Sequence, residues 1–413
     1  MGKLIKNFRT IFILLILAGQ SALFSQGVTY IENTIRLSPQ HNVYQKSNPR
    51  NINFIVHHPE TTLQGIYYQN NPVDYQAFSF IDIIVDEKDL NLPFTTKIVI
   101  DATFFDLLAE GNHELVFSFA NGESRSAKIK VEEDKTDYEM EIISFNVEHG
   151  VSVFIQLPDE NILIDTGPEN MTKKRVIPEL KKRGVTKIDH FIITHWHWDH
   201  YSGIEDIRAA FEIGEILFNL SEEGEKESRF QHNDIFTIGN EFSINDANFK
   251  VLNAARFDPT KFPAFKDEKF HGYTGKNNRS LSFNMEYKGF IYSHGGDIYQ
   301  HPQKAILQTF GEDAIKAHIY HGNHHFHGGV SANYLKQVNP FLFITPANPA
   351  TYNRAAYVEQ VMGNAVPYLE ANSERFIENL FDFEVGHITI SVNDSSDWRY
   401  ETDYVNEATL KQK

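Results

Sequence analysis

The sequence predicts an all-β domain followed by an α/β domain, and three observations carry this prediction. Short alternating segments separated by turn residues fill positions 28 to about 135, an acidic stretch follows, and strands then alternate with helices. At 413 residues the chain is too long for one ordinary core, so two domains are expected. We divide the chain into an N-terminal segment at 1–26, a β-sandwich at 28–135 and an α/β domain at 138–413.

The composition is that of a globular protein with an acidic surface. Hydrophobic residues make up 41% and aromatic residues 13% of the chain. Cysteine is absent, which excludes disulfides, thiolate metal ligands and a lipoprotein anchor. The 38 basic and 55 acidic residues give a net charge of −17, and without the three basic residues of segment 1–26 the charge is −20. Such a surface repels long nucleic acid but leaves room for a small phosphate ester held by metals.

The first 26 residues have the pattern of a secretory signal. Three basic residues precede the apolar run Ile11–Gly19, and the small and polar residues QSALFSQ follow it. Because nine apolar residues are too few to span a bilayer, we expect cleavage near Ser25 or Gln26, with an uncleaved anchor as the alternative. Export without disulfides suits a bacterial envelope, so the expected location is secreted or periplasmic.

Residues 28–135 read as a β-sandwich. The segments INFIV (Ile52–Val56), TKIVI (Thr96–Ile100) and AKIKV (Ala127–Val131) alternate with the period of half-buried strands. Turn residues separate such segments, as in QNNP (Gln69–Pro72) and NG (Asn121–Gly122). Several short strands without a long helix favour a sandwich.

KSNPRNINFIV and the later ATFFDLLAEGNHELVFSFANGESRSAKIKV resemble the Ig-like modules appended to secreted bacterial polysaccharide-degrading enzymes. The resemblance covers most of residues 36–132. It implies a spacer or docking role, with contact to a cell surface or a glycan, and no catalysis. The acidic stretch VEEDKTDYEME (Val131–Glu141) is the expected linker.

Beyond the linker, strands and helices alternate. ISFNV, VSVFIQL and NILID lead to an amphipathic helix around Met171–Arg183, and FIIT ends a buried strand at Thr194. A helix follows from about Ile204, and ITISV (Ile388–Val392) is the last predicted strand.

The stretch THWHWDH predicts a metal site. His195 and His197 are two apart, so in an extended segment both side chains point the same way, and Asp199 and His200 follow as the chain turns into a helix. A divalent metal is bound by several nitrogen and oxygen donors that converge from a rigid scaffold. This stretch supplies four such donors within six residues at the end of a strand. Burying them without a metal would be costly.

Two of the three tryptophans, Trp196 and Trp198, lie between these donors. If His195 and His197 point at a metal, Trp196 must point elsewhere, and we expect it to pack beneath the loop. Trp198 precedes the helix and is expected to reach the wall of a cleft, where an indole stacks on a substrate or excludes water.

H-x-H-x-D-H after an apolar strand is the signature of the metallo-β-lactamase superfamily, and the chain resembles that superfamily from about Glu141 to Val392. NILIDTGP supplies Asp165, which in the family supports the metal loop. FIYSHGGD supplies Asp297, which matches the carboxylate that bridges two metals. The resemblance implies an αββα sandwich and two divalent metal ions, with Zn²⁺ expected and Mn²⁺ or iron as alternatives.

Within the superfamily, the chain is most similar to the metal-hydrolase domain of DNA-uptake competence proteins. The run EIISFNVEHGVSVFIQLPDENILIDTG carries this likeness, with NNRSLSF and VGHITI. One departure is His149, where that branch usually has glutamine. Another is the motif HGNHHFHGG, which leaves the final histidine ligand open among four residues: His321, His324, His325 and His327. We expect His321, because it ends the strand AHIY, with His324 as the second choice.

The family's first metal also takes a histidine from a loop before the bridging aspartate. His271, 26 residues before Asp297, is the expected ligand, and the alternative is a loop histidine without metal contact. His232 is a weaker candidate, and His294 is expected to support the ligands.

The predicted reaction is metal-assisted hydrolysis of an ester. A bridged metal pair generates hydroxide at neutral pH and polarises the electrophile. Asp199 orients that hydroxide, and a histidine such as His324 gives the leaving group a proton. A bridging aspartate in the family accompanies phosphodiester, lactone and thioester hydrolysis, and the competence-like features favour a small or short phosphodiester. Open alternatives are a lactone, thioester or glycan-associated ester hydrolase, and a non-catalytic metal-binding attachment protein.

Overall fold

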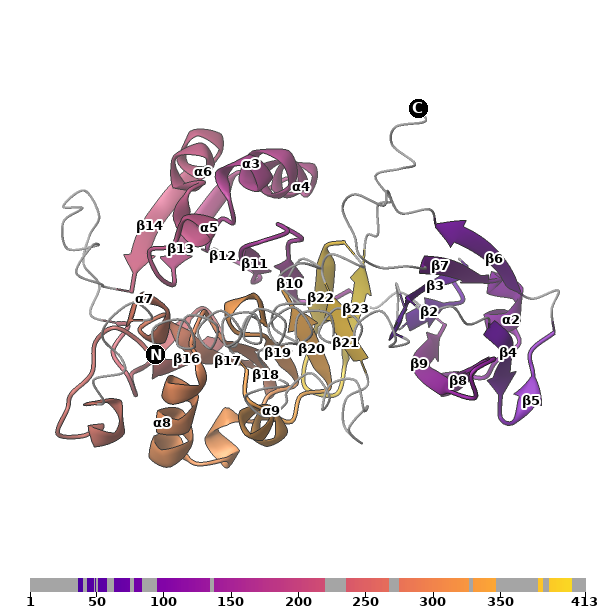
Figure 1. Cartoon of the computed structure of the whole chain (residues 1–413). Helices are drawn as coiled ribbons and strands as arrows, with labels where there is room; N and C mark the ends of the chain where they lie inside the picture. Colours follow the sequence, from indigo (N-terminus) through magenta and orange to yellow (C-terminus); the bar gives the residue numbers. More distant parts are fainter. Residues whose placement is uncertain are drawn as a thin grey trace, which may run out of the picture.

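The computed structural model describes residues 36–39, 43–47, 49, 51–57, 63–74, 78–83, 95–133, 137–219, 235–266, 275–326, 330–346, 378–381 and 386–402. Strands β1–β9 form two sheets, and strands β10–β23 form two more (Figure 1). The expected signal segment and His232, His271 and His327 lie outside the described residues. Among the helices that are described, none has the length and apolar character that crossing a membrane requires.

The first pair of sheets consists of strands together with the short helix α2 (Ala102–Asp106) among the residues described there. One sheet has the order β1 (Arg36–Pro39), β3 (Ile52–His57), β7 (Thr95–Ile100), β6 (Phe78–Ile83). The other has the order β2 (Val43–Gln45), β9 (Ser124–Glu132), β8 (Gly111–Phe119), β4 (Leu63–Tyr68), β5 (Asn71–Pro72). Alternate residues of β8, among them Leu115 and Phe117, are buried with Phe54 of the opposite sheet, so the two sheets share one core.

Turn residues set the connections as the sequence indicates. Gln69 and Asn70 have positive φ angles of 49° and 64° between β4 and β5. Gly122, with φ +86°, turns the chain between β8 and β9. These left-handed residues match the right-handed twist of the strands they join. The three strands predicted from alternation fall within β3, β7 and β9. The likeness to Ig-like modules stays a prediction.

The second pair of sheets has seven strands each. The first has the order β14 (Glu212–Phe218), β13 (Lys187–Ile193), β12 (Asn161–Ile164), β11 (Val153–Gln156), β10 (Met140–Ser144), β22 (Ile388–Val392), β23 (Trp398–Thr402). The second has the order β15 (Glu241–Ile244), β16 (Ala247–Asn253), β17 (Ser282–Tyr287), β18 (Phe290–His294), β19 (Ile319–His321), β20 (Leu342–Thr345), β21 (Glu378–Phe381).

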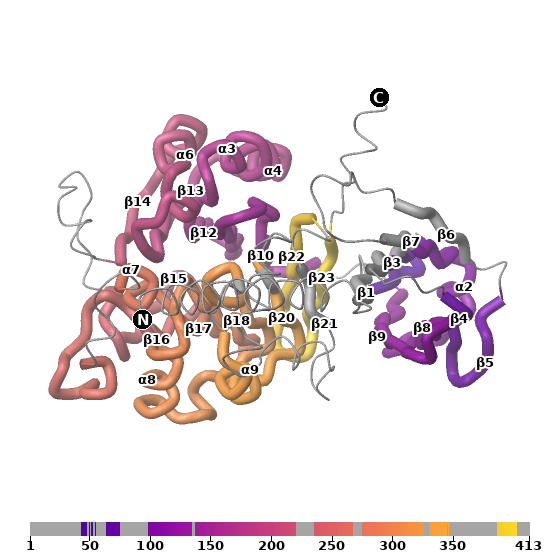
Figure 2. Tube along the Cα trace, viewed as in Figure 1, coloured from indigo at the N-terminus to yellow at the C-terminus, as the bar shows by residue number. Residues whose placement is uncertain are grey.

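Helices cover the outer faces of both sheets, which gives four layers (Figures 1 and 2). On the first sheet lie α3 (Glu169–Met171), a π-helical turn η2 (Thr172–Val176), α4 (Ile177–Lys182), α5 (Trp198–Tyr201) and α6 (Ile204–Ala210). Next to the second sheet are η4 (Pro263–Lys266), α7 (Gly275–Asn278), α8 (Gln300–Phe310), η6 (Asp313–Ile315), η7 (His324–Phe326) and α9 (Ala332–Val338).

Two hydrophobic clusters hold these layers together. One lies between the first sheet and its helices, where Leu163 and Phe191 pack with Leu180. The other joins the inner faces of both sheets and extends to α8 and α9. The expected αββα arrangement is therefore observed among the described residues between 137 and 402. The predicted amphipathic helix is the continuous helical stretch α3–η2–α4, and the predicted strand at Ile388–Val392 is β22.

The parallel strands position the site, because their carboxyl ends meet at one edge. In the first sheet β12, β13 and β14 are parallel, and in the second β18, β19, β20 and β21 are parallel. The two edges are joined directly where the Leu281 N–H donates to the Thr194 carbonyl, with N and O 3.1 Å apart. Loops from both sheets therefore open onto a common space.

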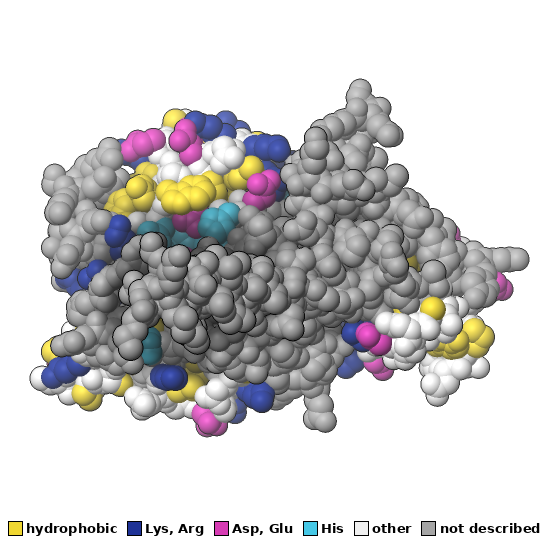
Figure 3. Space-filling model, viewed as in Figure 1, with side chains coloured by type: hydrophobic (Ala, Val, Ile, Leu, Met, Phe, Trp, Pro, Cys, Tyr) yellow, Lys and Arg dark blue, Asp and Glu magenta, His cyan; other side chains and the backbone are white. Residues whose placement is uncertain are grey.

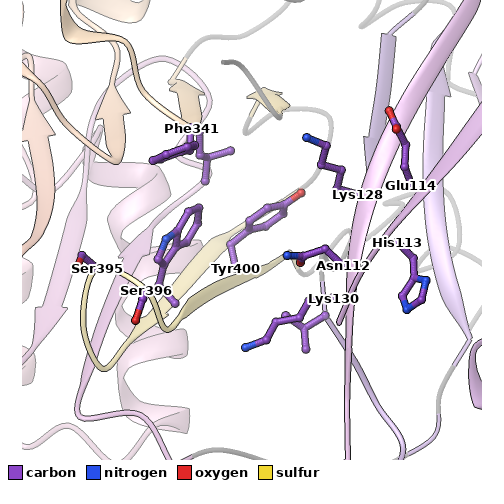
Figure 4. Close-up of a pocket in the computed structure, with 12 residues that line it drawn as sticks. Asn112, His113, Glu114, Lys128, Lys130, Phe341, Ser395, Ser396 and Tyr400 are labelled. Carbon is purple, nitrogen blue, oxygen red and sulfur yellow. The ribbon is translucent and has the colours of Figure 1, made fainter. Parts of the chain in front are cut away.

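The N-terminal sheets contact the second pair through β9 and β23. Lys130 lies 3.5 Å from Asp397, and Arg399 lies 4.0 Å from Glu132. Beside these ion pairs, a cavity of about 540 Å³ is lined by both regions, with Asn112 and Lys130 on one side and Phe341 and Tyr400 on the other (Figure 4).

Candidate metal centre

Asp165 organises the loop that carries the HWHWDH cluster. It follows β12, is fully buried and has a left-handed backbone with φ +56°. Its carboxylate accepts hydrogen bonds from Thr194 N at 2.8 Å, Thr194 Oγ1 at 2.6 Å and His200 Nδ1 at 2.7 Å. Since β12 and β13 are parallel and adjacent, Asp165 and Thr194 leave their strands side by side. Asp165 thus fixes both ends of the cluster, the supporting role that the sequence predicts for it.

Three imidazole nitrogens surround one carboxylate oxygen. Asp297 Oδ2 lies 3.4 Å from His195 Nε2, 3.2 Å from His200 Nε2 and 3.6 Å from His325 Nε2. All four side chains are buried. The histidines come from the loops after β13 and β19, and Asp297 comes from the loop after β18. The predicted residues His195, His200 and Asp297 are therefore brought together from both sheets.

The other ring nitrogen of two histidines is committed to an acceptor. His200 Nδ1 donates to Asp165, and His325 Nδ1 donates to the Pro346 carbonyl at 3.1 Å. In a neutral imidazole with a protonated Nδ1, Nε2 has no hydrogen and presents its lone pair. Hydrogen bonds of this kind are what orients metal-binding histidines.

His195 is held in the same way by Thr194. The Thr194 hydroxyl donates to Asp165, so it is an acceptor for His195 Nδ1, 3.2 Å away. His195 Nε2 therefore also faces Asp297 as a lone pair. Three lone pairs around one buried carboxylate oxygen repel one another unless cations lie among them.

The electrostatics of the centre reflect this need for positive charge. Burial raises the pKa of the Asp297 carboxyl, but the charges of His200, His325 and His195 outweigh burial and hold that pKa well below its usual range. Burial lowers the pKa of His200, but the carboxylates of Asp297 and Asp165 raise it well above its usual value. Without metal, protons on the histidines must supply the charge.

The donor set fits divalent metal ions. Asp297 Oδ1 is buried and has no hydrogen-bond partner among the described residues, so it is available for a second interaction. The ligand atoms of two sets each lie within 4.8 Å of one another: His195, His200 and Asp297, and His149, Asp199 and His325. Imidazole nitrogens with carboxylate oxygens are the ligands that Zn²⁺ takes when thiolates are absent.

His197 and the two tryptophans take the positions expected from alternation. His197 Nδ1 lies 3.0 Å from His195 Nε2, and burial together with the charge of His195 lowers the pKa of His197 to about 4. Trp196 points away and is buried, stacked on Phe218 with ring centroids 5.2 Å apart. Trp198 is 58% exposed at the rim. Histidine and acidic side chains gather beside hydrophobic ones on this face of the molecule (Figure 3).

The segment after β19 places His325, and not the expected His321, next to Asp199. His325 Nε2 lies 3.0 Å from Asp199 Oδ2. His321 is still within β19, and its Nε2 faces Ser144 Oγ at 3.1 Å inside the core, stacked against His294. Burial lowers the pKa of His321 far below its usual value. The geometry thus favours His325 over His321 as the ligand from this segment.

The turn that delivers His325 has an uncommon backbone. His324 and His325 both have left-handed φ angles, 47° and 49°, a conformation that costs about 1–2 kcal/mol for each residue other than glycine. Neighbours hold this turn: His324 N donates to the Gly296 carbonyl at 3.0 Å, and Asn323 Nδ2 donates to the Gly295 carbonyl at 2.9 Å. Strain of this kind persists at functional sites because the surroundings over-determine it.

His324, the predicted proton donor, lies at the edge of the centre. Its Nε2 is 4.0 Å from Asp297 Oδ2 and 2.9 Å from Asn277 Nδ2, and its ring packs against Tyr299. His324 therefore lies beside the centre, outside the two sets of ligand atoms that lie within 4.8 Å of one another. The structure describes no position for His271, so its role stays a prediction.

His149 is a contributor that the sequence reasoning did not assign. Its Nε2 lies 3.3 Å from Asp199 Oδ2. The sequence marks it only as the histidine of the turn NVEHG, ahead of Gly150.

Residues 146–242 match the family model of the metallo-β-lactamase superfamily, a range that includes Asp165 and the cluster from His195 to His200. The chain carries a metallo-β-lactamase superfamily domain. The superfamily predicted from the sequence is confirmed, and its fold is that of metal-dependent hydrolases.

The chain is also similar to ComE operon protein 3 of Bacillus subtilis (strain 168), at 24% identity over 229 residues. The match covers 49% of this chain and 27% of the relative, so the chain spans about a quarter of that protein's length. The expected likeness to competence proteins is confirmed at this level.

Among solved structures, a diphosphatase of the PhnP family is similar at 12% identity with a TM-score of 0.34, covering 51% of this chain and 86% of that one. A metallo-β-lactamase from Hirschia baltica is similar at 12% identity with a TM-score of 0.31, covering 55% and 95%. At these TM-scores the likenesses carry no weight for substrate or mechanism.

Proposed function

We propose that the protein is an exported, dinuclear-metal hydrolase that cleaves a small or short phosphodiester. The observation that carries this proposal is the convergence of three imidazole lone pairs on Asp297 Oδ2. When bound, two divalent ions supply a nucleophile from water at neutral pH and polarise the phosphoryl oxygen. Zn²⁺ is the proposed metal, with Mn²⁺ or iron as alternatives.

The chain's own residues have separate tasks in this reaction. Asp199 would help to hold one ion and orient the attacking water, because its Oδ2 lies 3.0 Å from His325 Nε2 and 3.3 Å from His149 Nε2. His324, held by Asn277, protonates the leaving oxygen. Trp198 borders a surface depression of about 450 Å³, where its exposed indole packs against an apolar or aromatic part of the substrate.

The choice of a phosphodiester rests on Asp297, whose Oδ2 lies among three histidines and would suit a carboxylate shared by two ions, and on the similarity to ComE operon protein 3. The choice of a small substrate rests on charge, since a net charge of −17 repels long polyanions. Export rests on the basic and apolar pattern at the start of the chain, and a mature N-terminus near Gly27, found by N-terminal sequencing, would support it.

The test is metal content and turnover of the purified full chain. We expect about two equivalents of metal per chain and hydrolysis of bis-p-nitrophenyl phosphate. Asp199→Asn should abolish this hydrolysis, whereas the exposed control Asp313→Asn should leave it unchanged. Cyclic dinucleotides, lactones and thioesters complete the panel. Turnover of lactones alone would replace the phosphodiester assignment, and metal-free protein without any turnover would favour an attachment protein.

We further propose that β1–β9 act as a docking module for a cell surface or a glycan. This region supplies no residue to the metal centre among those described, yet its strand β9 forms ion pairs with Asp397, just before β23, and with Arg399 in β23. Deleting residues 27–135 should leave turnover of a soluble substrate unchanged and reduce retention on cells or glycans. Unchanged retention would refute the docking role.

A further inference from the structure

His149 lies on a loop that is separate from the loops carrying the predicted ligands. The loop joins β10 to β11, yet it brings His149 Nε2 to 3.3 Å from Asp199 Oδ2. His325 Nε2 lies 3.0 Å from the same oxygen, and the rings of His149 and His325 have centroids 4.6 Å apart. The ligand atoms of these three residues all lie within 4.8 Å of one another, the spacing of ligands around one ion.

The backbone around His149 is shaped to approach the Asp199 loop closely. Gly150 has a φ of +146°, and a Cβ there would lie 2.4 Å from the Asp199 carbonyl oxygen and 2.7 Å from Pro168 Cδ. Only glycine permits this approach. Val151 N, 3.3 Å from the same carbonyl, completes the contact. The distance between His149 and Asp199 is therefore set by backbone packing.

Arg175 fixes the other side of the loop. Its guanidinium donates to the Asn146 carbonyl at 2.9 Å, to Asn146 Oδ1 at 2.8 Å and to Glu148 Oε1 at 3.1 Å. Glu148 N also donates to Asn146 Oδ1, at 3.1 Å. Because these bonds hold the residues just before His149, its imidazole is presented from a preorganised turn.

Ring stacking orients the imidazole itself. The Trp198 indole lies on one side, with ring centroids 6.0 Å apart and planes inclined by 24°, and His325 lies close by with planes inclined by 41°. The His149 side chain remains 38% exposed. A purely structural histidine has no need for this combination of an exposed ring, a fixed loop and a nitrogen aimed at a shared oxygen.

We propose that His149 is a ligand of the metal ion that Asp199 and His325 hold, an extra imidazole beyond the predicted ligand set. The proposal rests on the dinuclear centre proposed above. It makes this position richer in nitrogen, which favours Zn²⁺ over Mn²⁺. It also explains why the turn NVEHG combines a left-handed Glu148, with φ +65°, and an obligatory glycine around one histidine.

The experiment compares metal binding by the full chain with that of His149→Gln, using dialysed protein titrated with Zn²⁺ and with Co²⁺. The wild type should bind two equivalents. His149→Gln should keep one and bind the other at least about 10-fold more weakly, with a changed Co²⁺ absorption spectrum. His113→Gln, which removes a histidine from β8, is the matched control and should behave as wild type.

Unchanged affinity and an unchanged Co²⁺ spectrum in folded His149→Gln would overturn the proposal. A wild type that binds no metal would instead overturn the dinuclear centre, so the two failures are distinguishable. If His149→Gln does not fold, chemical modification of wild-type histidines by diethyl pyrocarbonate decides. His149 should become protected only when the second equivalent of Zn²⁺ is added, and equal modification with and without metal would refute ligation.

Discussion

Replacing Asp165 with asparagine should weaken metal binding although Asp165 is not expected to touch a metal. The Asp165 carboxylate accepts three hydrogen bonds, two from Thr194 and one from His200 Nδ1. An asparagine oxygen can still accept from Thr194 N. Its NH₂ group would then face the His200 Nδ1 donor, so His200 must move its proton to Nε2 and lose the lone pair that faces Asp297.

The magnitude follows from the bond that is lost. A buried hydrogen bond to a charged group contributes about 1.5–3 kcal/mol, so the metal-free variant should be less stable by about that amount. Loss of a partner that orients a metal-binding histidine typically costs about 10–100-fold in affinity. We therefore expect Zn²⁺ affinity to fall by about this factor.

Two measurements check this expectation for Asp165→Asn. Urea unfolding of chelator-treated protein gives the stability change, and competition with a chromophoric chelator gives the Zn²⁺ affinity. Asp189→Asn is the matched control, because Asp189 lies in the neighbouring strand β13 but pairs with Lys187 away from the centre. Wild-type Zn²⁺ affinity in a folded Asp165→Asn variant would refute the argument that Asp165 sets the His200 tautomer.

Three other predictions concern the rim, the His149 loop and pH. Trp198→Ala should raise KM by about 2–10-fold through lost stacking while metal content stays at wild type, and an unchanged KM in steady-state kinetics would remove its substrate role. Gly150→Ala should lower the free energy of unfolding, measured in urea, by more than the roughly 1–3 kcal/mol that backbone strain alone costs. Gly184→Ala is the control that measures the strain by itself, because Gly184 has φ +77° and open space around the added Cβ. Burial lowers the pKa of His387 to about 4 in the folded protein. The unfolded protein, in which His387 has its ordinary pKa, therefore binds a proton at higher pH, and the free energy of unfolding falls as pH drops from about 6.5 to 4. His387→Gln should lessen this fall by up to about 3 kcal/mol, and identical pH slopes for both proteins would contradict the assignment.

Several strands and the loop with the HWHWDH cluster could be predicted, because the sequence pattern within each of these segments agrees with the fold. Alternation and turn residues place β3, β7 and β9, and an apolar strand followed by donors places the loop at Thr194. Asp297 was predicted through resemblance, and its convergence with His195 and His200 follows from the meeting of parallel strand ends.

The sequence leaves the last histidine open among four residues and favours His321, because it does not show where β19 stops. His321 remains in the strand, paired in register with Ile344, and alternation then turns its side chain into the core. The chain must pass Gly322 and Asn323 and adopt two left-handed residues before His325 reaches Asp199. Local propensity does not predict two successive histidines with a left-handed backbone conformation, because this conformation is uncommon for residues other than glycine.

His149 was missed for a different reason. Its contact with Asp199 spans 50 positions in the sequence. The contact depends on Gly150, because the Asp199 carbonyl oxygen lies where any other residue would carry its Cβ atom. No pattern within one segment encodes such a contact, because each partner lies in a separate loop and the approach is set by tertiary packing.

The origin of the donors on both sheets has a mechanical consequence. His195 and His200 follow strand β13 of the first sheet, whereas Asp297 and His325 follow strands β18 and β19 of the second. The Leu281–Thr194 hydrogen bond is a direct backbone link between the two edges. A metal ion bound by these donors would link the two halves of the domain. Its binding energy opposes any motion that separates the two halves and adds to folding stability in proportion to the logarithm of metal concentration. Metal supply would then govern how long the protein stays folded as well as how fast it turns over.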